Sequence, residues 1–203
     1  MSGFPLVLNG EAIEALVVGG GAVAERRVAG LLEAGARVRV VAPAMIPALR
    51  ALRVSAPKLE LIERPFQPGD VGDALLVIAA TDDRATNARV AADARRAKRL
   101  LNVVDEPESG NCVTPAVHRS GDVVVAVTTG GVPGAAARIR DAIAERFDAR
   151  YAEATVALAA LRRKLLERGD RDAWRRASDA LLADGFCARV EGGQFPEEVR
   201  QWG

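Results

Sequence analysis

Along the first half of the chain, short apolar runs typical of strands alternate with segments whose apolar residues have helical spacing. Short aliphatic runs predict strands over residues 15–18, 37–42, 59–63, 75–80 and 100–104. Between these runs the apolar residues recur at helical spacing and predict helices over residues 23–34, 46–54 and 84–97. Strands that alternate with helices in this way form a parallel sheet covered by helices on both faces, so the expected fold class is α/β.

The pattern changes after residue 104. Two apolar runs, residues 112–117 and 123–128, flank a loop that contains Gly121 and therefore predict a hairpin. Beyond the hairpin, the periodicity predicts only helices, over residues 135–147, 152–167 and 173–183. We therefore expect three parts: an α/β domain over residues 1–112, a β connector and dimerisation region over residues 113–130, and a helical domain over residues 131–203.

Charge and composition exclude several classes of partner. The 203 residues include 28 Lys or Arg and 27 Asp or Glu, so no strong net field favours nucleic acid. No apolar run approaches the ~20 residues that a membrane span needs, and the N-terminus lacks the pattern of a secretory signal. Cys112 and Cys187 are far apart and belong to no CxxC pair, which is typical of buried thiols rather than of a disulfide or metal site. We expect a cytoplasmic protein with no nucleic-acid or membrane partner and no bound metal.

A glycine cluster connects the first predicted strand to the first predicted helix. Gly19 permits a tight turn, Gly21 lets the main chain approach a diphosphate, and the small Ala24 lets helix and strand pack closely. The amides at the start of the helix would face the phosphates. A glycine turn can also serve packing alone, but the strand before it and the amphipathic helix after it favour a dinucleotide pocket. The residues expected to hold the dinucleotide here are Gly19, Gly20, Gly21, Ala22 and Val23.

Ligands of open parallel sheets lie beyond the carboxyl ends of the strands, so the strand ends supply the other candidates. The second strand ends at Ala42 and Pro43 with no carboxylate for an adenosine ribose, and we expect main-chain groups there to hold the cofactor. Arg26 and Arg27 are the basic residues that could approach a 2′-phosphate, so the choice between NAD and NADP stays open.

The fourth and fifth strand ends add further cofactor-binding candidates. These are Ala80, Thr81, Asp82, Asn102 and Val104. Asp82 and Asp83 also suit the N-cap of the following helix, a role we favour over direct ligand contact. Asp105 follows the fifth strand, and its spacing leaves two interpretations open: a partly desolvated base near the reacting end of the cofactor, or a solvated turn residue.

Five ordered segments resemble one family. Residues 19–27, 32–36, 79–87, 102–105 and 125–131 occur in the order seen in the precorrin-2 dehydrogenase family, the NAD-dependent portion of siroheme synthases, which in some members also inserts iron. The resemblance implies a Rossmann-like sheet followed by a β connector and a helical C-terminal region, NAD as cofactor, and oxidation of precorrin-2 to sirohydrochlorin in siroheme or cobalamin biosynthesis. It also implies that Asp105 is the acid/base residue, that residues 4–8 form a short opening strand, and that two subunits exchange elements in a homodimer.

The expected substrate carries eight carboxylates, so it would need local positive charge from a nearly neutral protein. The residues expected to contact it are Thr128, Thr129, Gly130, Gly131, Arg119 and Arg138. For each arginine the competing interpretation is a surface charge paired with a nearby acid. Val132 stands where the family usually has a serine. The single histidine, His118, is more typical of a surface residue, or of one bonded to a backbone carbonyl, than of a catalytic group.

Two alternative functions stay open from the sequence. One is a bifunctional dehydrogenase and sirohydrochlorin ferrochelatase, although no cluster of His, Cys and Asp is present to hold a metal independently. The other is a non-catalytic nucleotide-sensing module, which would usually carry an acid after the second strand, where this chain has Ala42 and Pro43. With no methyltransferase segment in this sequence, precorrin-2 is expected to come from another protein.

Overall fold

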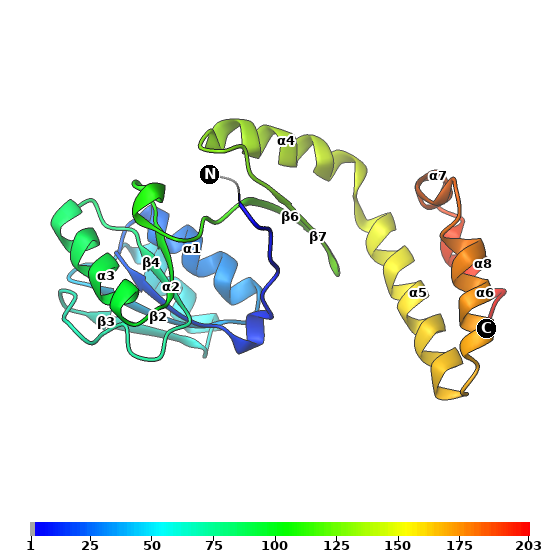
Figure 1. The fold of residues 1–203 in the computed structure, drawn as a ribbon, viewed down its shortest axis with the longest axis horizontal. Helices are drawn as coiled ribbons and strands as arrows, with labels where there is room; N and C mark the ends of the chain where they lie inside the picture. The colour runs from blue at the N-terminus through cyan, green and yellow to red at the C-terminus, as the bar shows by residue number, and fades with distance from the viewer. Residues whose placement is uncertain (1–2) are drawn as a thin grey trace. The chain divides into compact units, whose positions relative to one another are not determined.

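A computed structural model of the chain describes residues 3–203, which fold as two compact units, residues 3–114 and residues 115–203 (Figure 1). None of the helices within the described range combines the length and the apolar character needed to cross a membrane. The two units are described in turn.

The first unit is built on a five-stranded parallel sheet of order β3-β2-β1-β4-β5. Its strands are β1 (Glu14–Val18), β2 (Arg37–Ala42), β3 (Leu59–Glu63), β4 (Leu76–Ala79) and β5 (Leu100–Val103). Its helices are α1 (Ala22–Glu33), α2 (Pro47–Ser55) and α3 (Arg84–Arg96), with short 3-10 turns η1 (Gly10–Ala12) and η2 (Pro107–Ser109). The predicted Rossmann-like class is confirmed, and each of the five strands lies within a residue or two of its expected range.

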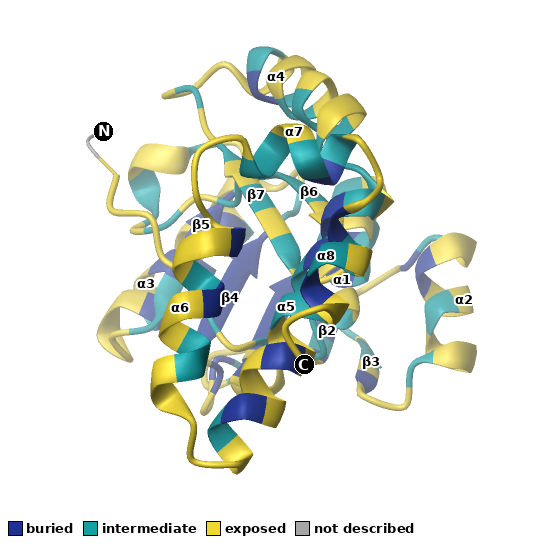
Figure 2. Ribbon diagram, turned by 90° about the vertical axis from the view of Figure 1, so that its right-hand side faces the viewer, coloured by how far each residue is buried: buried dark blue, intermediate teal, exposed yellow. Residues whose placement is uncertain are grey.

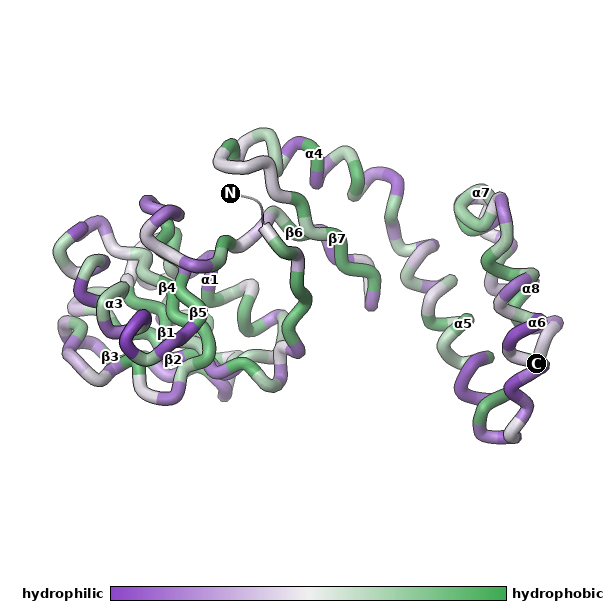
Figure 3. The backbone as a smooth tube through the Cα atoms, in the orientation of Figure 1, coloured by the Kyte–Doolittle hydropathy of each residue, from purple (hydrophilic) through white to green (hydrophobic). Residues whose placement is uncertain are grey.

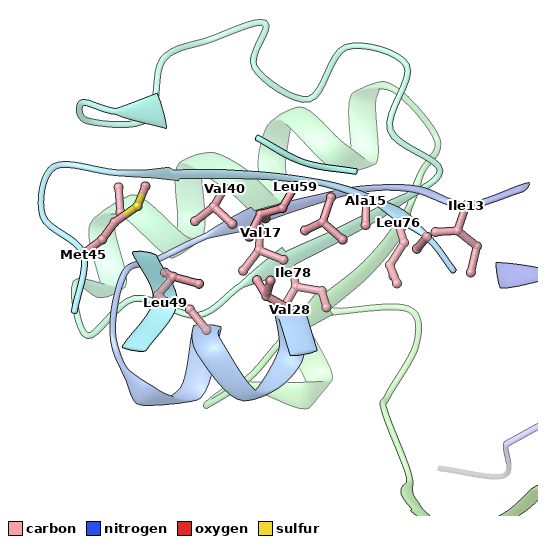
Figure 4. Packing of buried hydrophobic residues seen from close by; sticks show 14 residues of the cluster. Ile13, Ala15, Val17, Val28, Val40, Met45, Leu49, Leu59, Leu76 and Ile78 are labelled. Carbon is pink, nitrogen blue, oxygen red and sulfur yellow. The ribbon is translucent and has the colours of Figure 1, made fainter. Parts of the chain in front are cut away.

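Both faces of this sheet are buried, as parallel sheets require. On one face, Val17 and Val40 pack toward Val28 of α1 and Leu49 of α2 (Figure 4). On the other face, residues of β1, β4 and β5 pack against α3, where Val90 is fully buried. Burial and hydrophobic character coincide in these strands (Figures 2 and 3). The sheet is therefore a rigid base whose carboxyl edge presents the loops described below.

The second unit combines a hairpin with five helices. The hairpin pairs β6 (Ala116–Ser120) with β7 (Val123–Val127) in antiparallel register. The helices are α4 (Pro133–Arg146), α5 (Ala149–Glu167), α6 (Arg171–Leu181), α7 (Phe186–Glu191) and α8 (Phe195–Arg200). Tyr151, Leu165, Leu181 and Phe195 form the centre of its core. The expected helical C-terminal region is confirmed, with the two short helices α7 and α8 added to the three that periodicity predicted.

The first strand of the hairpin begins later than its apolar run predicts. The amides of Asn111 and Cys112 both donate to the carbonyl oxygen of Leu101, at 2.9 and 3.1 Å, so this stretch is bonded to β5. Pro115 then offers no amide hydrogen to a ladder. The strand expected over residues 112–117 consequently runs over Ala116–Ser120 instead.

The opening strand expected at residues 4–8 is not found. No strand is assigned to this stretch, and Phe4 and Val7 are 89% and 82% exposed. Leu8 alone of these residues packs against the core of the first unit. Pro5 has no amide hydrogen to offer a strand ladder, and the segment forms no strand pair within the described residues.

Candidate functional site

Hydrogen bonds at the carboxyl edge of the first unit bring four strand ends into one row. The Gly19 amide donates to the Val41 carbonyl at 3.0 Å, and the Ala80 amide donates to the Val18 carbonyl at 2.8 Å. The Val104 amide continues the row by donating to the Ala79 carbonyl at 3.0 Å. The loops that carry the predicted cofactor-binding residues therefore leave the sheet at the same edge.

The first two glycines of the cluster are required by close backbone packing. Gly19 has φ +137°, and a Cβ added there would lie 2.3 Å from the Ala80 carbonyl oxygen. A Cβ on Gly20 would lie 1.9 Å from the Ala44 carbonyl oxygen. These positions hold the β1–α1 loop against the loops that follow β4 and β2.

Gly21 stands in a different environment. A Cβ there would meet no protein atom within 4 Å. Gly21 is the N-cap of α1, and no side chain caps the helix. Helix N-termini with free amides and open space attract anions through those amides and the helix dipole. The geometry at Gly21 therefore fits a diphosphate, while Ala24, fully buried against the core, allows the close approach of helix and sheet.

The loop after β4 is held by a side-chain amide. Asn87, on α3 and only 6% exposed, donates from Nδ2 to the Thr81 carbonyl at 2.9 Å. Its Oδ1 accepts from the Thr81 hydroxyl at 2.7 Å and from the Thr81 amide at 3.3 Å. Three hydrogen bonds from one buried side chain thus restrain the loop at Thr81.

Asp83 alone provides the N-cap that the sequence assigned to Asp82 and Asp83 together. Its carboxylate accepts from the amides of Ala85 and Thr86 and, at 2.6 Å, from the Thr86 hydroxyl. The Thr86 hydroxyl bond is the main cause of a pKa for Asp83 below the usual range, and the amides of Ala85 and Thr86 add to it. Asp82 is exposed and takes no part in the cap, so its side chain is available to solvent or ligand.

The fifth strand presents one buried and one exposed candidate. Asn102 is 4% exposed, its Nδ2 donates to the Cys112 carbonyl at 3.1 Å, and its buried Oδ1 has no partner. Asp105, three residues on, is exposed. The partly desolvated aspartate considered from the sequence is therefore not seen in this structure, where the Asp105 carboxylate is in water.

In the second unit, the loop between β7 and α4 is open and glycine-dependent. Gly130 and Gly131 have φ +65° and +114°, with no atom near either Cβ position. The Thr129 hydroxyl donates to the Val132 carbonyl at 2.6 Å, while Thr128 is exposed. The main chain of this loop is accessible to a ligand.

Arg119 and Arg138, the two basic candidates in this unit, are both exposed. Arg140, two residues after Arg138 in α4, pairs with Asp141 at 2.6 Å. Both candidate guanidinium groups are thus at the surface, and guanidinium groups bind carboxylates well.

His118 is bonded within the second unit. Its Nε2 lies 2.6 Å from the Phe147 carbonyl oxygen, which can only accept, so Nε2 carries the hydrogen. The nearby Ser120 hydroxyl donates to the Asp148 carbonyl at 2.7 Å. Both side chains connect β6 to the junction of α4 and α5. The bond to a backbone carbonyl is one of the two non-catalytic roles that the sequence left open for His118.

No group of three or more His, Cys, Asp and Glu side chains is gathered closely enough within residues 3–203 to hold a metal ion. Burial raises the pKa of the half-buried Cys112 thiol above its usual range, which keeps that thiol protonated.

Comparison with known proteins identifies the family. A family model described as "Putative NAD(P)-binding" matches residues 6–116, more than half of the 203 residues. The chain belongs to this family. The description of the model names NAD(P), which supports a nicotinamide dinucleotide as the type of cofactor. Together with the relatives and the solved structure described next, this match confirms the resemblance to the precorrin-2 dehydrogenase family.

The relatives of this chain within the family include curated siroheme synthases. The siroheme synthase of Pseudomonas aeruginosa is 46% identical over 125 residues, 62% of this chain and 27% of that protein. The siroheme synthase of Thioalkalivibrio sulfidiphilus is 34% identical over 220 aligned positions, 96% of this chain and 45% of that protein. This chain thus spans less than half the length of these two relatives.

A solved structure named SirC, precorrin-2 dehydrogenase, shares the fold. The match has a TM-score of 0.77 at 24% sequence identity and covers 98% of this chain and 99% of that chain. The likeness therefore extends beyond the α/β unit to the hairpin and the helices that follow it.

Proposed function

We propose that this chain oxidises precorrin-2 to sirohydrochlorin with NAD⁺ as the hydride acceptor. The observation that carries the proposal is the uncapped, open start of α1 at Gly21, on the same sheet edge as the strand that delivers Asp105. The names of the relatives, siroheme synthase and precorrin-2 dehydrogenase, support the reaction.

The cofactor would lie along the carboxyl edge. The amides of Ala22 and Val23 would bind the diphosphate, with Gly21 leaving room for it. Main-chain groups of Ala42 and Pro43 would hold the adenosine side, and those of Ala80 and Thr81 the nicotinamide side. Asp82, Asn102 and Val104 complete the proposed cofactor-binding set.

Asp105 would take the proton that the oxidation releases. Precorrin-2 loses two electrons and two hydrogens: one leaves as hydride and the other as a proton, for which the exposed Asp105 carboxylate is the proposed acceptor. Bound NAD⁺ supplies the two-electron acceptor. The substrate itself would remove water from Asp105 as it covers the strand tip, so the protein contributes mainly orientation.

The carboxylates of the substrate would be recognised by the second unit. Arg119 and Arg138 would pair with carboxylates, and the open main chain of Thr128, Thr129, Gly130 and Gly131 would donate amide hydrogens to them. We also propose that the protein works in the cytoplasm and that it forms a homodimer. Sedimentation of the purified chain would test the homodimer.

The test is an anaerobic assay with precorrin-2 and NAD⁺. We expect NADH and sirohydrochlorin to appear in equal amounts, each followed by its absorbance. Binding of NAD⁺ without either product would favour a nucleotide sensor and overturn the proposal. Addition of Fe²⁺ to the product mixture, with protein-free product as control, then tests whether the chain also inserts iron.

A further inference from the structure

The end of β2 lacks the group that usually reads the adenosine ribose. In dinucleotide-binding folds a carboxylate there bonds the 2′-hydroxyl, whereas an arginine there accepts a 2′-phosphate. Here β2 ends in the buried Ala42, and the exposed Pro43 and Ala44 follow it. Within the proposed dinucleotide site, a side chain from another element is therefore needed for any discrimination between the 2′-hydroxyl and a 2′-phosphate.

Glu63 lies beside this position. It is the last residue of β3 and the register partner of Ala42, and paired strands lie about 4.8 Å apart. Leu59 and Leu61, at alternate positions before it, pack into the core beneath α1 and α2, so Glu63 is on that same face of the sheet. A carboxylate is therefore present at the carboxyl edge, one strand over from its usual place.

Arg50 of α2 fixes the orientation of this carboxylate. Its Nε and Nη2 donate to the two Glu63 oxygens at 3.0 and 2.7 Å, a bidentate pair. Two main-chain hydrogen bonds connect Arg50 to the β1–α1 loop. The Arg50 amide donates to the Ile46 carbonyl, and the Ile46 amide donates to the Gly20 carbonyl at 2.9 Å. The ion pair is thus attached to the segment that packs on the proposed diphosphate site.

The pair is available to a ligand and charged at neutral pH. Both side chains are 48% exposed. The Arg50 hydrogen bonds hold the pKa of Glu63 below its usual range. A carboxylate has about four lone-pair sites, of which Arg50 uses two, so acceptor capacity remains for a hydroxyl.

We infer that Glu63, oriented by Arg50, distinguishes the ribose 2′-hydroxyl from a 2′-phosphate and makes the site selective for NAD⁺ over NADP⁺. A 2′-phosphate would face a like charge on Glu63, and that carboxylate is already the counter-ion of the Arg50 guanidinium. The inference rests on the proposed function, because it assumes a dinucleotide along this edge.

The test compares dissociation constants for NAD⁺ and NADP⁺ by calorimetry. We expect the wild type to prefer NAD⁺. In Glu63→Gln the repulsive charge is lost and Arg50 is released, so the ratio of the NADP⁺ constant to the NAD⁺ constant should fall at least about tenfold. In Arg50→Gln the carboxylate stays without its cation, and the ratio should not fall.

Glu197→Gln is the matched control. Glu197 pairs with Arg200 in α8 and is similarly exposed, so its removal should leave the ratio unchanged. An unchanged ratio in Glu63→Gln, or a wild type that prefers NADP⁺, would overturn the inference while leaving the dinucleotide site intact. A wild type that binds neither dinucleotide would instead overturn the proposed function, and this inference with it.

Discussion

The side-chain amide of Asn87 closes a ring of hydrogen bonds with Thr81, accepting from its hydroxyl at 2.7 Å and donating to its carbonyl at 2.9 Å. Asn87 is almost completely buried, so solvent does not readily replace these bonds. The loop that we propose for the nicotinamide side of the cofactor thus depends on a residue six positions further along the chain.

Asn87→Ala should therefore weaken both stability and cofactor binding. Loss of the buried bonds should lower the free energy of unfolding by about 1–3 kcal/mol, and the loosened loop should raise the NAD⁺ dissociation constant. Chemical denaturation and calorimetry measure the two effects.

Asn111→Ala is the control for this prediction. Asn111 makes two comparable bonds, accepting from the Leu101 amide at 2.7 Å and donating to the Arg99 carbonyl at 2.9 Å, at the amino end of β5. Its loss should reduce stability without changing NAD⁺ affinity. Equal weakening of binding in both variants would contradict a specific role for Asn87.

Asp105→Asn should separate catalysis from binding. Removal of a proton acceptor usually lowers turnover by about 10²- to 10⁴-fold, while NAD⁺ affinity should be unchanged because the exposed side chain supports no cofactor loop. Glu108→Gln, which removes another exposed carboxylate three residues away, should retain activity. If Asp105→Asn turns over at the wild-type rate, another group accepts the proton.

Gly21→Asp should abolish NAD⁺ binding in a protein that is folded as well as the wild type. The space around Gly21 is open and its extended backbone suits an N-cap, where aspartate bonds the helix amides. Stability should hold or rise, by less than about 1 kcal/mol, because a capping carboxylate replaces a flexible glycine. The new carboxylate would accept hydrogen bonds from the amides that we propose bind the diphosphate, and its charge would repel the phosphates.

Two other glycines make this prediction specific. Gly30→Asp places the same charge in open space on the same helix and should leave binding intact. Gly19→Ala should destabilise the fold, since its Cβ would collide with the Ala80 carbonyl. Retained binding in Gly21→Asp would exclude the start of α1 as the diphosphate site. Thermal unfolding and calorimetry test all three variants.

Asp70→Asn should expose a pH-dependent contribution to stability. Two Arg64 donors, at 2.8 and 2.7 Å, are the main reason that the pKa of Asp70 lies below its ordinary value of 3.8. A carboxyl group whose pKa is lower in the folded state than in the unfolded state stabilises the fold at pH values above its unfolded-state pKa. This stabilisation is lost as the pH falls through the folded-state pKa. The variant should be less stable at pH 7 by about 1–2 kcal/mol, with the difference vanishing at strongly acidic pH.

Denaturant titrations at neutral and acidic pH would measure this change for Asp70→Asn and for Asp73→Asn. The Asp73 side chain is fully exposed and lies 3.7 Å from Arg99, so its replacement should have little effect at either pH. A difference for Asp70→Asn that persists unchanged below the ordinary carboxyl range would show that packing, rather than charge, is responsible.

The sheet was predictable because its apolar runs and its glycine turn agree on the same fold. Gly19 and Ala24 could be assigned from spacing, since a tight turn and a close helix contact each require a small residue. The steric requirement for glycine at position 20 could not be predicted, because it comes from the carbonyl of Ala44, more than twenty positions away. The contacts of Asn87 with Thr81 and of Glu63 with Arg50 likewise depend on the folded chain, which brings these side chains together.

The errors also have physical causes. The run from Cys112 to Val117 is apolar enough for a strand, but its first residue bonds Leu101 instead of a hairpin partner. The helices α7 and α8 have six residues each, too short for a periodic signal, and depend on buried Phe195 and its neighbours. Asp82 and Asp83 carry the same side chain, and only the course of the backbone decides which of them caps α3.

The contacts of Gly19 with Ala80 and of Gly20 with Ala44 bring three loops from distant parts of the sequence into backbone contact as the chain folds. The proposed dinucleotide site would therefore be preorganised: the loss of conformational entropy that ordering these loops requires would occur on folding, before any nucleotide binds. Association should then resemble docking onto a rigid template, so that differences in affinity among analogues reflect how long each stays bound rather than how fast it enters.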